Sequence, residues 1–285
     1  MIANAPAPPA RPPLSPGRFA LLIAAGAALL ASLRISEVNP ALLFAPDALR
    51  SMGEFGAGFL PPDLSAAYLL ETLRPAAETV QLATAGTALA LLLGIPLALA
   101  AAGSFSLGGP LFAGDPPAGL LRRTLRTAPY FLSRLILNFM RSIPELIWAL
   151  LFVRAVGLGP TAGVIGLGIA YAGVVGKVFA EILEGTDLQP AVALRAAGAS
   201  LPKAILYGVL PPAFRTLLSY TLYRWECAMR AAAILGFVGA GGLGQHIAIS
   251  MRMFEHARTA TLILELFLLV ALTDILSARI RRRLS

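Results

Sequence analysis

The sequence is poor in charged residues. Asp, Glu, Lys and Arg make up 13% of its 285 positions, about half the share of an ordinary soluble domain. Apolar residues account for 57%, and the mean hydropathy is +0.76. So few charges cannot cover the surface of a soluble globule. The composition therefore excludes a soluble enzyme and a disordered chain, and it indicates an integral membrane protein.

The sequence also lacks the signatures of nucleotide, metal and covalent chemistry. It has no Gly-x-x-x-x-Gly-Lys-Ser/Thr loop, no Gly-x-Ser-x-Gly elbow, and one cysteine, Cys227, which has no partner for an intrachain disulfide. Its two histidines, His246 and His256, are ten residues apart and do not have metal-ligand spacing. We expect no catalytic residue, cofactor or metal. Any uphill transport must draw its energy from an ion gradient or from another subunit.

Six apolar segments have the length and composition of transmembrane helices, although the first is short. They are residues 19–33, 77–102, 130–156, 160–182, 213–238 and 259–278. The expected fold is therefore all-α, a polytopic membrane protein with six transmembrane helices. Because a basic residue precedes the first segment, a cleaved signal peptide is the alternative to a retained helix there.

The basic residues set the expected orientation. The formal charge of +8 is interleaved with apolar segments, so we assign it to the lipid surface and not to nucleic acid. With both termini in the cytoplasm, 11 Arg and Lys residues outside the segments are cytoplasmic and 5 are periplasmic. This bias favours N-in and C-in. The expected parts are a disordered tail (1–18), a first helix with a periplasmic loop (19–76), a transmembrane domain (77–279) and a basic tail (280–285).

The cytoplasmic stretch 183–212 contains two expected short helices. Pro190 opens the first, which closes near Gly198, and Pro202 opens the second, which Pro211 and Pro212 end. A short helix lying across the membrane face is a plausible docking element. A simple connector between transmembrane helices is the alternative.

The fifth segment carries charges near its middle. Such charges are costly in a bilayer and normally face the bundle interior or a water-filled path. Glu226 and Arg230 are four residues apart, so we expect them to pair along the helix. Arg224 is left without that partner, and we consider both a structural role and a place in a translocation pathway or gate for all three residues.

A glycine-rich run, GFVGAGGLGQ, follows this segment at residues 236–245. Its glycines disfavour a stable helix. Irregular backbone at membrane depth is tolerated only where protein buries it or water reaches it. We expect a re-entrant or gate-like turn, with a flexible loop as the alternative, formed by Gly239, Gly241, Gly242 and Gly244.

The third segment carries a polar stripe. Its members, at helical spacing, are Arg134, Asn138, Arg141 and Glu145. We expect the first three to lie near the interface, and Pro144 to kink the helix as it enters the core. Glu145 lies deeper and needs a partner, either Arg141 or a residue of the fifth segment. In the fourth segment, Lys177 and Glu181 are expected to pair.

Four stretches resemble the phosphonate ABC transporter permeases of the PhnE type. They are SIPELIWALLFVRAVGLGPTAG (142–163), LRAAGAS (194–200), YGVLPPAF (207–214) and YTLYRWECAMRAAAILGFVGAGGLGQ (220–245). The resemblance is dense over about 130–250. It implies a type I ABC importer permease fold, a five-helix core plus an N-terminal helix.

The wider group of binding-protein-dependent permeases carries a cytoplasmic motif, E-A-A, three residues, Gly, nine residues, I-x-L-P. The positions that match it here are Ala193, Gly198, Leu210 and Pro211. Val192 stands in place of the Glu, Leu194 in place of the second Ala, and Gly208 in place of the Ile. The resemblance implies that this loop docks into a cytoplasmic ATPase.

The resemblance also implies a homodimer in the inner membrane, two copies of an ABC ATPase and a periplasmic phosphonate-binding protein. The cargo would be phosphonates, with phosphite or phosphate esters as an extension. A permease for another small solute such as methionine is the alternative within this class. An ion-coupled secondary transporter is a further alternative, but the sequence shows no second copy of the fifth segment's pattern, as internal repeats would require.

Overall fold

The computed structural model describes residues 16–36, 42, 44–113 and 119–284. Residue contacts divide the chain into two units, 1–57 and 58–285. Most of the tail expected over 1–18 lies outside the described residues. The first unit contains α1 (Pro16–Ile35) and nearly all of α2 (Pro46–Gly58). Helix α1 has 20 residues and no buried side chain, and at 1.5 Å per residue it is about 30 Å long, enough to cross a bilayer core.

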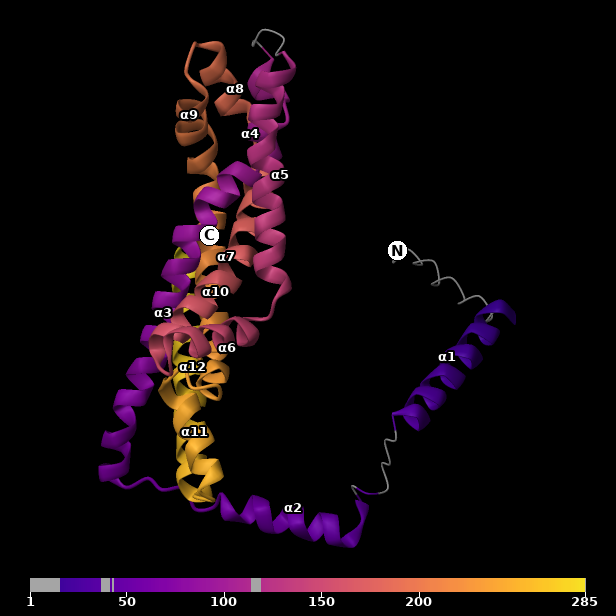
Figure 1. The fold of residues 1–285 in the computed structure, drawn as a ribbon, viewed down its shortest axis with the longest axis vertical. Helices are drawn as coiled ribbons and strands as arrows, with labels where there is room; N and C mark the ends of the chain where they lie inside the picture. The colour runs from indigo at the N-terminus through magenta and orange to yellow at the C-terminus, as the bar shows by residue number, and fades with distance from the viewer. Residues whose placement is uncertain (1–15, 37–41, 43, 114–118, 285) are drawn as a thin grey trace, which may run out of the picture. The chain divides into compact units, whose positions relative to one another are not determined.

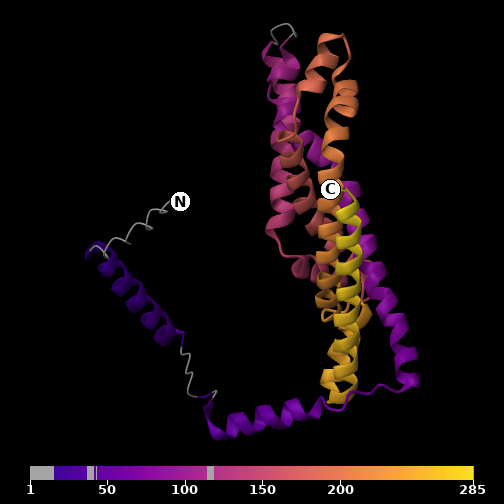
Figure 2. The same cartoon turned by 180° about the vertical axis from the view of Figure 1, so that it is seen from behind.

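The second unit is an elongated helical bundle (Figures 1 and 2). No strand occurs among the described residues. Its longer helices are α3 (Ala66–Ala101), α5 (Leu120–Ser142), α6 (Glu145–Val156), α7 (Pro160–Glu184), α10 (Leu210–Gly236), α11 (Gly242–Arg252) and α12 (His256–Leu284). The shorter ones are α4 (Gly103–Ser106), η2 (Pro110–Phe112), α8 (Gln189–Ala196), α9 (Leu201–Ala204) and the π-helix η3 (Ile205–Val209). Helices α4, α8 and α9 lie at one end of the bundle, and α11 lies toward the other (Figure 1).

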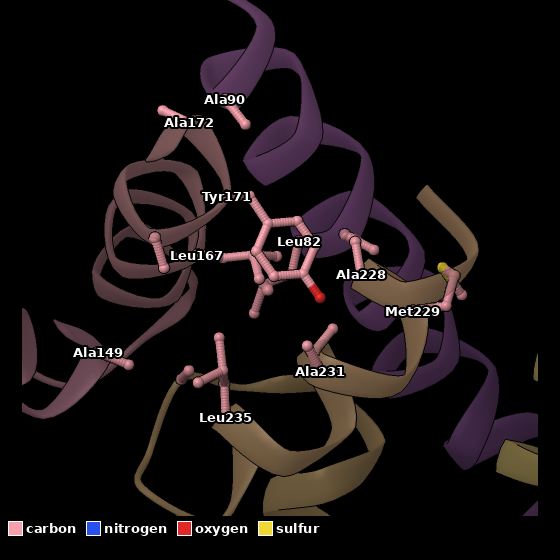
Figure 3. Packing of buried hydrophobic residues seen from close by; sticks show 14 residues of the cluster. Leu82, Ala90, Ala149, Leu167, Tyr171, Ala172, Ala228, Met229, Ala231 and Leu235 are labelled. Carbon is pink, nitrogen blue, oxygen red and sulfur yellow. The ribbon is translucent and has the colours of Figure 1, made fainter. Parts of the chain in front are cut away.

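The core of the bundle is built from α3, α6, α7 and α10. Figure 3 shows Leu82 of α3, Leu167 and Tyr171 of α7, and Leu235 of α10 packed together, with alanines filling the space around them. The glycines of α7 let its neighbours approach closely, which is how helices associate in lipid. Because α7 is covered on several sides, it forms the centre of the unit.

Length and composition single out four helices as membrane spans, α1, α3, α7 and α12, and a fifth span if the bent pair α5–α6 is counted as one. Helix α10 has 27 residues, long enough to span, but it carries four charged residues. The all-helical polytopic prediction is confirmed, with four or five candidate spans in place of the six expected. The full set of six stays a proposal.

Two helix boundaries differ from those expected. Helix α3 begins at Ala66 and runs across residue 76, where the periplasmic loop was expected to end. Helix α5 begins at Leu120, ten residues before the third segment's predicted start at Tyr130. In both cases polar residues continue the helical pattern past the apolar run, because a helix need not end where its hydrophobic stretch ends.

Pro144 produces a break where a kink was expected. Helices α5 and α6 meet at 86°, and the indole N–H of Trp148 donates to the carbonyl of Met140 across the bend, with an N–O distance of 3.1 Å. Glu145 therefore begins α6 and does not continue the polar stripe of α5.

Pro211 and Pro212 were expected to end the second short helix. They lie instead in the first turn of α10. Proline is tolerated there because the first N–H groups of a helix need no intrahelical acceptor. The stretch that was expected to hold a second short helix is α9 followed by η3, which continues directly into α10.

Candidate functional site

The first candidate region is the loop between α7 and α10. Helix α8 ends as predicted near Gly198, whose φ of +88° places it in the left-handed region that favours glycine. The Gly198 N–H donates to the carbonyl of Arg195, and the Ala199 N–H donates to that of Leu194. A Cβ at Gly198 would meet no atom within 4 Å, so this turn is open at the surface.

The four motif positions fall in two places. Ala193 and Gly198 are exposed on α8 and its terminal turn, whereas Leu210 and Pro211 begin α10. Gly208, which replaces the motif's Ile, is buried, and a Cβ there would lie 2.5 Å from the Cα of Ala191. The glycine thus lets η3 pack backbone to backbone against α8.

Arg195 joins this loop to a distant part of the chain, which sequence reasoning missed. Its Nε donates to the carbonyl of Leu111 at 3.1 Å, and its Nη1 donates to that of Ala199 at 2.9 Å. Leu111 is buried in the same apolar cluster as Ala191 of α8. Arg126 of α5 stacks over the ring of the neighbouring Phe112, with its guanidinium carbon 4.3 Å from the ring centroid. The η2 segment therefore supports α8, both through the hydrogen bond from Arg195 and through the packing of Leu111 in the cluster with Ala191.

The second candidate region is the charged middle of α10. The guanidinium carbon of Arg224 lies 4.0 Å from the ring centroid of Tyr171 on α7, a cation–π contact. Its Nε is buried and has no hydrogen-bond acceptor. No carboxylate lies within ion-pair distance of Arg224 in the described part of the chain. Arg224 is therefore a positive charge that lies on the ring face of Tyr171 and has no ion-pair partner among the described residues.

The predicted pairing of Glu226 with Arg230 is wrong. Glu226 is buried, and its Oε1 lies 2.6 Å from Nη1 of Arg281 on α12. Arg230 lies 3.5 Å from Asp274, also on α12. Helices α10 and α12 run antiparallel beside each other (Figure 2), so Glu226 and Arg230 each pair with a residue of α12 and not with each other.

Glu145 makes no ion pair among the described residues, with Arg141 or with any residue of α10. It is partly buried at the first turn of α6, where the positive end of the helix dipole favours a carboxylate. Arg134, also on the predicted stripe, pairs instead with Glu184 of α7 at 2.7 Å. The expected pair of Lys177 and Glu181 is confirmed, at 3.6 Å.

The glycine-rich run forms a tight turn and not a loop. Gly239, Gly241 and Gly242 have φ values of +92°, +89° and +71°. Residues 240–244 of this turn are buried, and the Leu243 N–H donates to Oγ1 of Thr79 on α3 at 2.9 Å. In a second hydrogen bond to the turn, the Gly159 N–H donates to the carbonyl of Gly239 at 2.9 Å.

The glycines were expected to disfavour a helix. Part of the run is nevertheless helical, because α11 begins at Gly242 and includes Gly244. A Cβ on Gly244 would overlap the carbonyl oxygen of Ala233 on α10. The glycine is therefore required for the close crossing of α10 and α11, a packing reason that the sequence alone did not separate from flexibility. Within the described residues, no group of His, Cys, Asp and Glu side chains could hold a metal.

The bundle is similar to solved ABC importer permeases. A methionine ABC transporter, MetNI, solved in inward-facing conformations, matches with a TM-score of 0.61 and 23% identity, over 78% of this chain and 100% of that one. An amino acid ABC transporter solved with histidines matches with a TM-score of 0.56 and 16% identity, over 77% of this chain and 99% of that one. At these identities the likeness shows the fold alone.

Sequence relatives are closer. The phosphite transport system permease protein PtxC of Stutzerimonas stutzeri is 34% identical over 261 residues, which is 90% of this chain and 86% of that protein. The putative phosphite permease HtxC of the same organism is 36% identical, over 82% of this chain and 76% of that protein. The phosphate-import permease protein PhnE of Mycolicibacterium smegmatis is 32% identical, over 73% of this chain and 36% of that protein.

Residues 116–285 match the family of binding-protein-dependent transport system inner membrane components, and the chain belongs to this family. It is thus a multi-pass inner-membrane permease, the non-catalytic transmembrane subunit of an ABC transporter. Permeases of this family work with ATPase subunits and a binding protein. Membership excludes the ion-coupled secondary transporter that was kept as an alternative.

Proposed function

We propose that this permease imports small phosphorus oxyanions, namely phosphonates, phosphite or phosphate esters. The sequence relatives that carry phosphite and phosphate names support this cargo class. The observation that carries the proposal is Arg224, a guanidinium with no carboxylate partner, held on the face of Tyr171. An anion crossing a low-dielectric slab needs such a fixed positive charge, and a guanidinium offers paired N–H donors that match two oxygens of a phosphonate.

In this proposal, Arg224 and Glu145 line the path, and the buried glycine turn forms its outer gate. The lack of a salt bridge at Arg224 supports a path role, because an arginine already paired with a carboxylate would attract an anion less. The negative charge of Glu145 partly offsets the positive charge of Arg224, so that the anion binds weakly enough to be released. Glu226 and Arg230, first considered for the path, both have partners on α12 and are assigned here to the α10–α12 contact.

The proposed complex contains two copies of this chain, two copies of an ABC ATPase and one periplasmic binding protein. The bundle end that carries α8 and α9 would face the cytoplasm and the ATPase, with both termini on the same side. The exposed Ala193 and the open turn at Gly198 support this docking surface. The bracing of α8 by Arg195 also supports it, because a coupling element must transmit force without yielding.

Substitution of Arg224 tests the proposed path. In vesicles with the partner subunits, Arg224→Gln should reduce uptake of labelled 2-aminoethylphosphonate by tenfold or more, since it removes the charge, while the amount of assembled complex is unchanged. Arg224→Lys keeps the charge without the forked donors and should be intermediate. Arg215→Gln is the matched control, because Arg215 is exposed on the same helix. If assembly falls in proportion to uptake, Arg224 is structural and the path role is wrong.

A further inference from the structure

Helix α2 is amphipathic, and none of its side chains is buried. In helical projection its apolar side chains fall within an arc of about 120°, and its charged side chains fall on the opposite side of the helix. The apolar arc contains Ala48, Leu49, Met52 and Phe55, and the polar arc contains Asp47, Arg50, Ser51 and Glu54. A helix with two such faces is suited to the boundary between water and an apolar phase.

The two arcs differ in what they contact. On the polar arc, Nε of Arg50 donates to Oε1 of Glu54 at 2.8 Å, and both side chains are exposed. On the apolar arc, Leu49 and Met52 are 52% and 58% exposed, and Phe55 is half exposed. The polar arc therefore needs only water around it, whereas the apolar arc presents large side chains that favour an apolar partner.

The place of α2 in the chain identifies that partner. Residues 36–45 connect it to the candidate span α1, and residues 59–65 connect it to the candidate span α3. The longer connection can reach no more than about 35 Å. Helix α2 itself has 13 residues, so it is about 20 Å long, too short to cross a hydrocarbon core of about 30 Å. Its sequence neighbours thus hold α2 near the membrane surface without letting it cross.

The charges of α2 favour the hydrophobic part of that surface over its headgroups. Asp47, Arg50 and Glu54 are its three charged residues, and they sum to −1. A helix that binds anionic lipid by charge carries several Lys or Arg residues on its polar face. Attachment of α2 would therefore come from burial of its apolar arc and would not need anionic lipid.

We propose that α2 is an interfacial helix that lies in the plane of the membrane surface. Leu49, Met52 and Phe55 enter the boundary between headgroups and acyl chains, and the Arg50–Glu54 pair faces water. The helix thereby holds the connection between α1 and α3 against the lipid. This proposal does not rest on the cargo, and it stands or falls separately from the proposed function.

Spin labels on the full-length chain test this placement. In a Cys227→Ser background, labels are attached after Leu49→Cys and Met52→Cys on the apolar arc, and after Asp47→Cys and Ser51→Cys on the polar arc. The chain is reconstituted in phosphatidylcholine vesicles, and collisions with oxygen, which concentrates in lipid, are compared with collisions with a water-soluble nickel chelate. We expect the ratio of oxygen to nickel collisions to be several-fold higher on the apolar arc. Added phosphatidylglycerol or salt should leave it unchanged.

A charge on the apolar arc should release the helix. Met52→Glu should raise nickel collisions of the label at position 49 several-fold, because burying the new carboxylate in lipid is costly. Ser51→Glu is the matched control, since it adds the same charge to the polar arc and should change nothing. Equal nickel access at all four labelled positions would overturn the proposal, and so would low access of both reagents to the apolar arc, which would mean that protein covers it. Contact that requires phosphatidylglycerol would contradict attachment by the apolar arc.

Discussion

At the scale of single residues, contacts between helices explain the charges of α10 and the glycine at position 244 of α11. Glu226 and Arg230 have the spacing for a pair along one helix, yet each pairs with a residue of α12. Spacing along the chain reveals local partners only, whereas these contacts join residues 44 or more positions apart. The isolation of Arg224 could be anticipated from the sequence, because no acid stands three or four residues away, but its contact with Tyr171 could not.

Gly244 gives a prediction on stability. In Gly244→Ala, the new methyl group would collide with the carbonyl of Ala233, and neither backbone can move without opening the α10–α11 crossing. We expect a destabilisation of about 1–3 kcal/mol, measured as a lower midpoint of thermal unfolding in detergent. Gly26→Ala in α1 is the control, because a Cβ there meets nothing within 4 Å and should not lower the midpoint. An unchanged midpoint in Gly244→Ala would show that the crossing is looser than described.

At the scale of elements, the sequence predicted the positions of most helices but not how they end. The apolar runs located α3, α5, α7, α10 and α12, because burial in lipid or protein requires such runs. The 86° break before α6 exceeded the expected kink. The hydrogen bond from Trp148 to Met140 spans this break, and such a contact forms only in the folded chain. The bracing of α8 by η2 was missed for the same reason, since Arg195 and Leu111 are 84 residues apart.

Two substitutions distinguish the support of α8 by η2 from the exposed docking surface of α8. Arg195→Ala removes the hydrogen bonds of the side chain to Leu111 and Ala199 and should weaken co-purification of the ATPase about tenfold, because α8 loses this support while its exposed face is intact. Gly198→Asp should abolish co-purification, since it places a charge on the open turn and strains a backbone at positive φ.

Two controls accompany these variants. Lys203→Ala changes an exposed base on the adjacent α9 and should leave co-purification unchanged. Membrane insertion of each variant is measured in parallel, so that loss of the chain is not mistaken for loss of docking. Normal co-purification in both Arg195→Ala and Gly198→Asp would remove this loop from the coupling role.

At the scale of the whole molecule, the proposed orientation follows from the distribution of basic residues. Reporter fusions after Arg126, after Pro202 and at the C-terminus should give cytoplasmic signals. Fusions at Met52 in α2 and at Phe254, in the turn between α11 and α12, should give periplasmic signals. A cytoplasmic signal at Met52 would mean that α1 does not cross the membrane, and a periplasmic C-terminus would reverse the proposed topology.

The central claim is that this permease passes phosphorus oxyanions at the expense of ATP hydrolysed by a partner subunit. The most direct measurement is uptake of labelled 2-aminoethylphosphonate into vesicles that contain the permease, its ATPase and its binding protein. We expect uptake with ATP and none with ADP, competition by excess phosphite, and no competition by methionine. ATP-dependent uptake of methionine, without uptake or competition by any phosphorus oxyanion, would contradict the account.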